Sequence, residues 1–132
     1  HKGLDFAAPK GTPIYSAGNG VIEYVGRNGG YGKYIRIRHN GSYKTAYAHL
    51  NSFKKNIYKG LRVNQGDIIG YVGSTGKSTG PHLHYEVIYQ GNQINPKKMN
   101  LPSGKVLKDK ELEKFKVEMN VIYSDFLFTL YE

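Results

Sequence analysis

Alternating apolar and polar positions predict β-strands through most of the first hundred residues. The clearest case is residues 33–39, where Ile35 and Ile37 fall on the face expected to be buried. The pair Asn40-Gly41 follows, which is typical of a two-residue hairpin turn, and residues 43–49 then predict the returning strand. We therefore expect an antiparallel hairpin in the middle of the chain.

Two stretches share a second pattern, in which a glycine is followed three positions later by a β-branched residue and the segment closes on Val-Gly. These stretches are residues 11–26 and residues 60–73. The glycines supply positive φ angles, or room for a neighbouring backbone, as turns between short strands require. The chain therefore contains a weak internal duplication of one β unit.

The pattern changes after residue 100. Residues 101–104, Leu-Pro-Ser-Gly, interrupt the alternation, and Asp109 suits a helix N-cap. Apolar residues then recur in steps of three and four, which predicts an amphipathic helix; they are Leu112, Phe115, Met119, Ile122 and Phe126. More apolar residues near the end leave two interpretations: the helix packs on its own domain, or it docks on a segment upstream of residue 1. We divide the chain into a domain over residues 1–100 and a helical tail over residues 101–132.

Composition and charge narrow the class of protein. A chain of 132 residues can form one domain with a sizeable core, and 17 glycines with 12 tyrosines suit short strands and tight turns. It has no cysteine, which excludes disulfides and thiolate metal ligands, and no apolar run near the roughly 20 residues of a transmembrane helix. The net charge of +9 favours polyanionic partners. Since Lys and Arg are scattered and no nucleic-acid motif is present, we expect no nucleic acid, and an anionic cell-wall polymer or a generic basic surface explains the charge.

Candidate chemistry is concentrated on the segment around His82. Side chains alternate along a strand, so His82, His84 and Glu86 share one face. Two imidazoles two residues apart can bind or flank a single metal ion, and His1 and Asp5 supply a further nitrogen and a carboxylate, all of which suit zinc. The alternative is a pair of ordinary surface or core histidines, with a disordered residue at the chain end and a common turn aspartate.

Several motifs occur in order along the first 96 residues, and together they are far more specific than any one alone. They include His1-x-x-x-Asp5, Gly32-Lys33-Tyr34-Ile35, Tyr47-Ala48-His49-Leu50 and Gly80-Pro81-His82-Leu83-His84. This set resembles the lysostaphin-type zinc metallopeptidases, also called LytM-domain peptidases, which cut peptide bonds in the bacterial cell wall. The resemblance runs from His1 to about Pro96, and it marks residues 1–100 as the peptidase domain.

The resemblance implies a role for each candidate residue. His1, Asp5 and His84 would bind Zn²⁺, and three protein ligands leave a fourth position open for water. His49 and His82 would lie beside the metal as catalytic residues. One would accept the proton of the attacking water, and the other would hydrogen-bond the developing oxyanion or donate to the leaving amine. Which histidine does which stays open.

The resemblance also implies a fold and a reaction. We expect a mostly β fold, an antiparallel sheet or flattened barrel with a groove, of the duplicated type found in the family, followed by a C-terminal α-helix. The implied activity is that of a zinc-dependent endopeptidase acting on peptidoglycan peptide stems. Residues 95–115 also resemble the end of Gram-negative murein D,D-endopeptidases, which implies cleavage of the cross-link from D-alanine to meso-diaminopimelate. A glycyl-glycine endopeptidase is the nearest enzymatic alternative.

A rival of another class is a catalytically inactive LytM module, which binds and regulates other cell-wall hydrolases and typically lacks some metal residues. All five functional positions are filled in this sequence, which favours the enzyme. Because a natural chain rarely begins on a metal ligand, we expect an N-terminally truncated fragment. Its export signal, its first strand and any regulatory domains would lie upstream, and the expected location is the periplasm or cell envelope.

Overall fold

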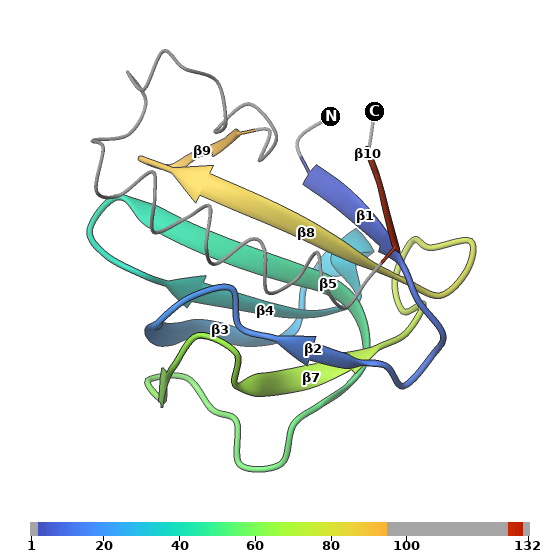
Figure 1. The fold of residues 1–132 in the computed structure, drawn as a ribbon, viewed down its shortest axis with the longest axis horizontal. Coiled ribbons are helices and arrows are strands. Elements are labelled where there is room, and N and C mark those ends of the chain that lie inside the picture. The colour runs from blue at the N-terminus through green and yellow to red at the C-terminus, as the bar shows by residue number, and fades with distance from the viewer. Residues whose placement is uncertain (1–2, 95–126, 131–132) are drawn as a thin grey trace.

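The computed structural model describes residues 3–94 and 127–130. These residues form strands, joined by turns and one short 3₁₀ helix (Figure 1). The elements are β1 (Gly3–Ala7), β2 (Pro13–Tyr15), β3 (Gly20–Arg27), η1 (Gly29–Tyr31), β4 (Lys33–Arg38), β5 (Tyr43–Phe53), β6 (Arg62–Val63), β7 (Ile68–Val72), β8 (His82–Tyr89), β9 (Asn92–Ile94) and β10 (Leu127–Leu130). The described part of the chain is therefore mostly β, as the sequence predicts.

All strand pairs in the sheet are antiparallel, and the main order is β10-β1-β8-β5-β4-β3-β6. The long strand β5 pairs with both β4 and β8, and its last residues pair with β7, which in turn carries β2. Among the described residues, β6 and β10 lie at opposite ends of this order and do not pair with each other, so this part of the sheet is open. The prediction of an antiparallel sheet is confirmed. The alternative, a flattened barrel, is wrong. Alternation of residues predicts where strands form but does not determine whether the sheet closes on itself.

The two stretches that share the repeated pattern pair with each other in the sheet. The first unit supplies β2 and β3, and the second supplies β6 and β7. Each unit pairs with the other, because β2 lies against β7 and β3 lies against β6. Backbone hydrogen bonds continue both pairings, including Ser16 N to Asp67 O at 2.8 Å and Gly60 N to Ile22 O at 2.8 Å.

The predicted hairpin is β4 and β5, and its turn is longer than the sequence indicates. His39 N donates to Tyr43 O at 2.9 Å, which leaves residues 40–42 as a three-residue turn rather than a two-residue one. The Asn40 carboxamide oxygen accepts from the backbone N–H groups of Ser42 and Tyr43 at 2.7 and 3.0 Å. This side-chain bond takes the place of a backbone turn, which is a common use of asparagine.

One face of the central strands forms the core. Leu83, Tyr85 and Val87 of β8 are fully buried, and Leu4 and Phe6 of β1 pack with them. Burial of each such side chain is worth about 1.5–3 kcal/mol relative to exposure. The alternation predicted for β8 is therefore confirmed, and it leaves the other face of that strand for polar residues.

The C-terminal part of the chain is described only in part. Residues 127–130, which we expected within the helical tail, form β10 and pair with β1 through Leu4–Leu130 and Phe6–Phe128. The predicted amphipathic helix lies outside the described residues, and the division of the chain at residue 100 stays a prediction. Among the described residues, no helix is long and apolar enough to cross a membrane.

Candidate metal centre and catalytic groove

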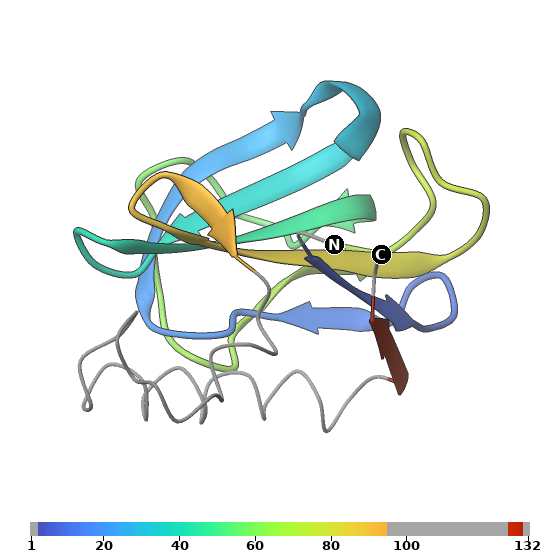
Figure 2. The same ribbon diagram turned by 90° about the horizontal axis from the view of Figure 1, so that it is seen from above.

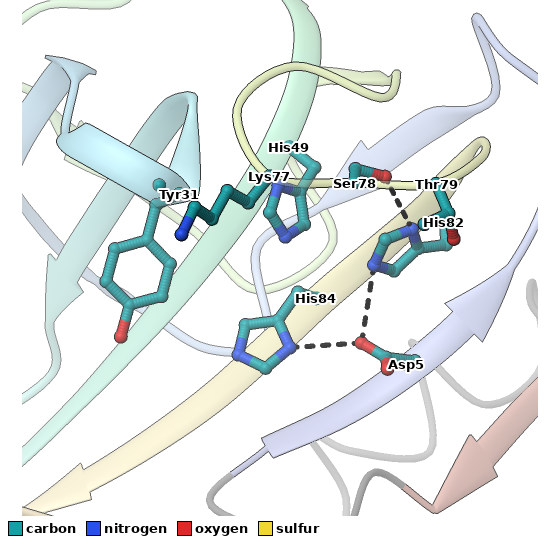
Figure 3. A pocket seen from close by; sticks show the side chains of 9 residues that line it. Asp5, Tyr31, His49, Lys77, Ser78, Thr79, His82 and His84 are labelled. Atoms are coloured by element: carbon teal, nitrogen blue, oxygen red, sulfur yellow. Dashed lines mark hydrogen bonds and ion pairs between the residues drawn. The ribbon is translucent and has the colours of Figure 1, made fainter.

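Asp5 and His84 meet because β1 and β8 are neighbouring antiparallel strands. The two residues are directly paired in the register, and Asp5 Oδ1 lies 3.0 Å from His84 Nδ1. The same carboxylate oxygen lies 3.5 Å from His82 Nε2 (Figure 3). Three of the side chains predicted from the sequence are thus brought together by the sheet register.

His49 reaches the same place through a break in its strand. Tyr47 and Leu50 both belong to the core although they are three residues apart, and the pairing of β4 with β5 shifts register between Lys33 and Ile35. His49 itself has φ of 65°, in the left-handed region that side chains other than glycine rarely adopt. The extra residue is a β-bulge, a feature that is common beside active sites. It turns His49 out of the core, so that its ring lies 4.9 Å from that of His82 between centroids.

His49 and His82 are oriented in the same way, each by a hydrogen bond from its Nδ1 to a backbone carbonyl. His49 Nδ1 lies 2.7 Å from the carbonyl oxygen of Thr75, and His82 Nδ1 lies 2.9 Å from that of Gly80. A carbonyl can only accept, so each Nδ1 carries the hydrogen and donates it. In the neutral rings Nε2 is then the atom with the free lone pair. Figure 3 shows both rings turned toward Asp5 and His84.

The surroundings shift the pKa values of two imidazoles, those of His49 and His84, in opposite directions. Burial lowers the pKa of His49. The hydrogen bond to the Thr75 carbonyl acts to raise it, and nearby His82 and His84 act to lower it further, against Asp5. Burial also acts to lower the pKa of His84, but hydrogen bonds to Asp5 and Glu86, together with their charges, raise it to about 9. His49 therefore favours the neutral form, whereas the position of His84 favours a positive charge.

The Asp5–His84 pair suits a zinc ion. Carboxylate oxygen and imidazole nitrogen are zinc ligands, and ligands about 2.0–2.1 Å from a tetrahedral zinc lie roughly 3.3 Å apart, close to the 3.0 Å between these two atoms. A Cβ atom on Gly3 would lie 2.7 Å from His84 Cε1, so the glycine leaves room for the imidazole. His1, the third predicted ligand, lies outside the described residues. Within those residues no group of three His, Cys, Asp or Glu side chains is placed to hold a metal ion.

These side chains line one cavity of about 460 Å³ on the polar face of the sheet. Its walls are the short 3₁₀ helix η1 and the loop of residues 73–80. Both rise on the same side of β8 (Figure 2). The residues that line it are Asp5, Gly30, Tyr31, His49, Lys77, Ser78, Thr79, His82 and His84. We call this cavity the groove, a feature that the family resemblance implies.

Hydrogen bonds join the two walls, one between backbone groups and one from a backbone N–H to a side chain. Lys77 N donates to Gly30 O at 2.8 Å, and Lys33 N donates to Thr75 Oγ1 at 3.0 Å. Gly32 and Gly76 both have positive φ, and a Cβ atom on either would lie 2.4 Å from the other loop. Glycine is therefore required at both positions for this close approach.

Sequence reasoning missed part of the site. It placed Glu86 on the same face as His84 but assigned it no role, and it assigned no role to Tyr31 or Lys77. Alternation along β8 identifies the face of Glu86. No sequence signal shows that Tyr31, 55 residues away, donates to the Glu86 carboxylate at 2.9 Å.

Residues 1–96 match Peptidase family M23, and the chain belongs to this family. The predicted resemblance to lysostaphin-type peptidases is thereby confirmed. DD-carboxypeptidase/endopeptidase Mpg of Neisseria meningitidis serogroup B is 50% identical over 103 residues, which are 78% of this chain and 23% of that protein. The chain spans between 21% and 32% of the length of the curated relatives it matches.

Solved structures of similar proteins agree with the fold. A zinc containing peptidase from Vibrio cholerae has a TM-score of 0.67 and 42% identity, and the likeness covers 71% of this chain and 28% of that one. The catalytic domain of lysostaphin from Staphylococcus simulans has a TM-score of 0.65 and 38% identity, and the likeness covers 68% of each chain. At these identities the likeness extends beyond the fold to a shared family.

Proposed function

We propose that this chain is the catalytic domain of a zinc-dependent peptidoglycan endopeptidase that cuts the cross-link from D-alanine to meso-diaminopimelate. The observation that carries the proposal is the convergence of three imidazoles and one carboxylate, from β1, β5 and β8, on one groove. The name of the Neisseria relative, a DD-carboxypeptidase/endopeptidase, supports the choice of bond.

His1, Asp5 and His84 would hold the zinc ion. The V. cholerae relative, described as a zinc containing peptidase, supports the choice of metal. When bound, zinc supplies a Lewis acid that lowers the pKa of water and polarises a carbonyl group. The roles of the three ligands are part of the proposal, since His1 lies outside the described residues.

His49 is the proposed general base. Its Nδ1–H is held by Thr75, so Nε2 faces the groove with a free lone pair, and burial lowers its pKa so that the ring is neutral at pH 7. It can therefore accept the proton of the attacking water.

His82 is the proposed acid. Since its Nδ1–H is held by Gly80, only a protonated Nε2 can donate toward the oxyanion or the leaving amine. Asp5 Oδ1 lies 3.5 Å from that Nε2.

The substrate follows from the groove and from the family. A groove of about 460 Å³ has room for a segment of peptide on either side of the scissile bond. We place the working protein in the periplasm or cell envelope, where peptidoglycan stems are found, and further domains of the same protein are proposed partners.

Two assays test the function. Purified protein is loaded with Zn²⁺ and incubated with a dimeric muropeptide that contains the D-alanine to meso-diaminopimelate bond, and separately with a pentaglycine peptide. Mass analysis should show monomeric muropeptides and intact pentaglycine. Cleavage of pentaglycine alone would reassign the bond to a glycyl-glycine endopeptidase. Zinc binding without cleavage of either peptide would favour the inactive binding module.

A further inference from the structure

We propose that Glu86 is a positioning residue that fixes the tautomer and orientation of His84, and that Tyr31 and Gln93 hold the Glu86 carboxylate in place. The inference rests on the proposed role of His84 as a zinc ligand. Glu86 lies on β8, two residues beyond His84 and on the same face, and its relative exposure is 3%.

The two carboxylate oxygens of Glu86 accept hydrogen bonds from three residues on three elements of the fold. Oε2 accepts from His84 Nε2 at 2.8 Å and from the Tyr31 hydroxyl at 2.9 Å, and Oε1 accepts from the Gln93 carboxamide at 2.9 Å. The Gln93 carboxamide also donates to the Tyr31 hydroxyl at 3.1 Å. The carboxylate is thus held from β8, η1 and β9 at once. A buried carboxylate is stable in such a place only when its oxygens are paired in this way.

The pairing determines which nitrogen of His84 meets a metal. An ionised carboxylate can only accept, so His84 Nε2 carries its hydrogen toward Glu86. The other nitrogen, Nδ1, is then the one that faces Asp5 at 3.0 Å. A ligand histidine whose second nitrogen donates to a carboxylate is held in one tautomer and is a better metal ligand. Without Glu86 the ring could turn over or take the other tautomer, and Nδ1 would no longer be presented.

The residues around Glu86 and His84 leave space for the hydrogen bond between them. Ala46 and Ala48 on β5 are paired with Glu86 and His84, so small side chains lie beside the two polar ones. Tyr31 packs on Tyr34 at 5.0 Å between ring centroids, which fixes the hydroxyl that reaches Glu86. Because Tyr31 also lines the groove, the wall and the metal centre share one hydrogen-bond network.

The experiment measures zinc affinity and the tautomer of His84, not activity. Glu86→Gln, Glu86→Ala and Tyr31→Phe are stripped of metal and titrated with Zn²⁺ against a chelator of known affinity. ¹⁵N spectra of the zinc-loaded proteins report which ring nitrogen of His84 carries hydrogen. Glu23→Gln is the matched control, since that carboxylate pairs with Arg36 and Lys44 on the sheet outside the groove.

We expect zinc to bind about 10–100-fold more weakly when Glu86 is changed, with alanine worse than the isosteric glutamine. Tyr31→Phe, which keeps the Glu86–His84 bond, should weaken zinc binding by less than Glu86→Gln. Glu23→Gln should bind as the parent does. In the parent, His84 Nε2 should carry the hydrogen, and in Glu86→Ala a second tautomer should be present.

Two outcomes separate the possibilities, and a second variant covers a failure to fold. Equal zinc affinity in the parent, Glu86→Gln and Glu86→Ala would overturn this inference and leave the proposed function standing. A parent that binds no zinc would overturn the proposed function, and the inference with it. If Glu86→Ala does not fold, as judged by circular dichroism, Glu86→Gln decides, because it keeps the shape of the side chain.

Discussion

Asp5 and His84 stand directly opposite each other on antiparallel strands, with Oδ1 of one 3.0 Å from Nδ1 of the other, although 79 residues separate them in the chain. The backbone hydrogen bonds of β1 and β8 hold the two strands in register, so no flexible segment has to close to assemble the pair. A site built on paired strands is held more precisely than one built on loops. The groove walls, η1 and the loop of residues 73–80, carry Tyr31 and Lys77, to which the sequence assigned no role.

The two histidines of β8 should respond differently to replacement. His84→Ala removes a proposed zinc ligand, and we expect zinc content after gel filtration to fall to near zero together with activity. His82→Ala leaves the proposed ligands in place, so we expect bound zinc with turnover reduced by about 10²–10⁴-fold. Zinc lost from His82→Ala but kept by His84→Ala would show that the two roles are exchanged.

Activity should persist below the ordinary titration range of histidine. Burial lowers the pKa of His49 from its usual value of 6.5, so the ring stays neutral, and able to accept a proton, as the pH falls through 6.5. We expect the acid limb of kcat/KM to have its midpoint below pH 6.5. The profile is measured between pH 4.5 and 8 with zinc content checked at each point. A midpoint above 6.5 with zinc still bound would exclude His49 as the base.

Zinc-free protein should lose stability as the pH rises above neutrality. In the folded chain the pKa of His84 is raised to about 9, against 6.5 for a free histidine, because Asp5 and Glu86 favour its charge. The stabilisation is complete below pH 6.5 and is lost as the pH rises toward 9. Urea unfolding of chelator-treated protein at pH 6.5 and 9.5 tests this, with His84→Asn as the variant in which the difference should shrink. An equal difference in both proteins would contradict the assignment.

Gly32→Ala should destabilise the groove wall. The residue has φ of 67°, and an added Cβ would lie 2.4 Å from the backbone carbon of Thr75. We expect a loss of about 2 kcal/mol or more, measured as a lower melting temperature.

Gly41→Ala is the matched control for that loss. It also lies in a turn, but an added Cβ there meets nothing within 4 Å. We expect its melting temperature to stay near that of the parent. Equal melting temperatures for the two variants would contradict the requirement for glycine at position 32.

Much of the site could be predicted from the sequence, because it depends on strand alternation and on short motifs. Alternation along one strand put His82, His84 and Glu86 on one face, and the apolar positions of the same strand became core. Ordered motifs indicated the family, and with it the roles proposed for Asp5 and His49. Each of these signals is carried by a short stretch of sequence, where strand periodicity and residue type hold the information.

Other features had no local signal. Strand alternation alone would point His49 into the core, and only the bulge between Tyr47 and Leu50 turns it toward the groove. A bulge depends on how β5 pairs with its neighbours, which is a property of the assembled sheet.

The sequence by itself determined the strands, the polar face of β8 and the family. The tertiary structure decided which residues from distant segments share a hydrogen bond: Tyr31 and Gln93 with Glu86, and Thr75 with His49. It also decided that the sheet stays open over residues 3–94 and 127–130, with β6 and β10 at its two ends. The physical reason is that periodicity fixes the direction of a side chain relative to its own strand, whereas its partners depend on register and loop packing, which involve the whole chain.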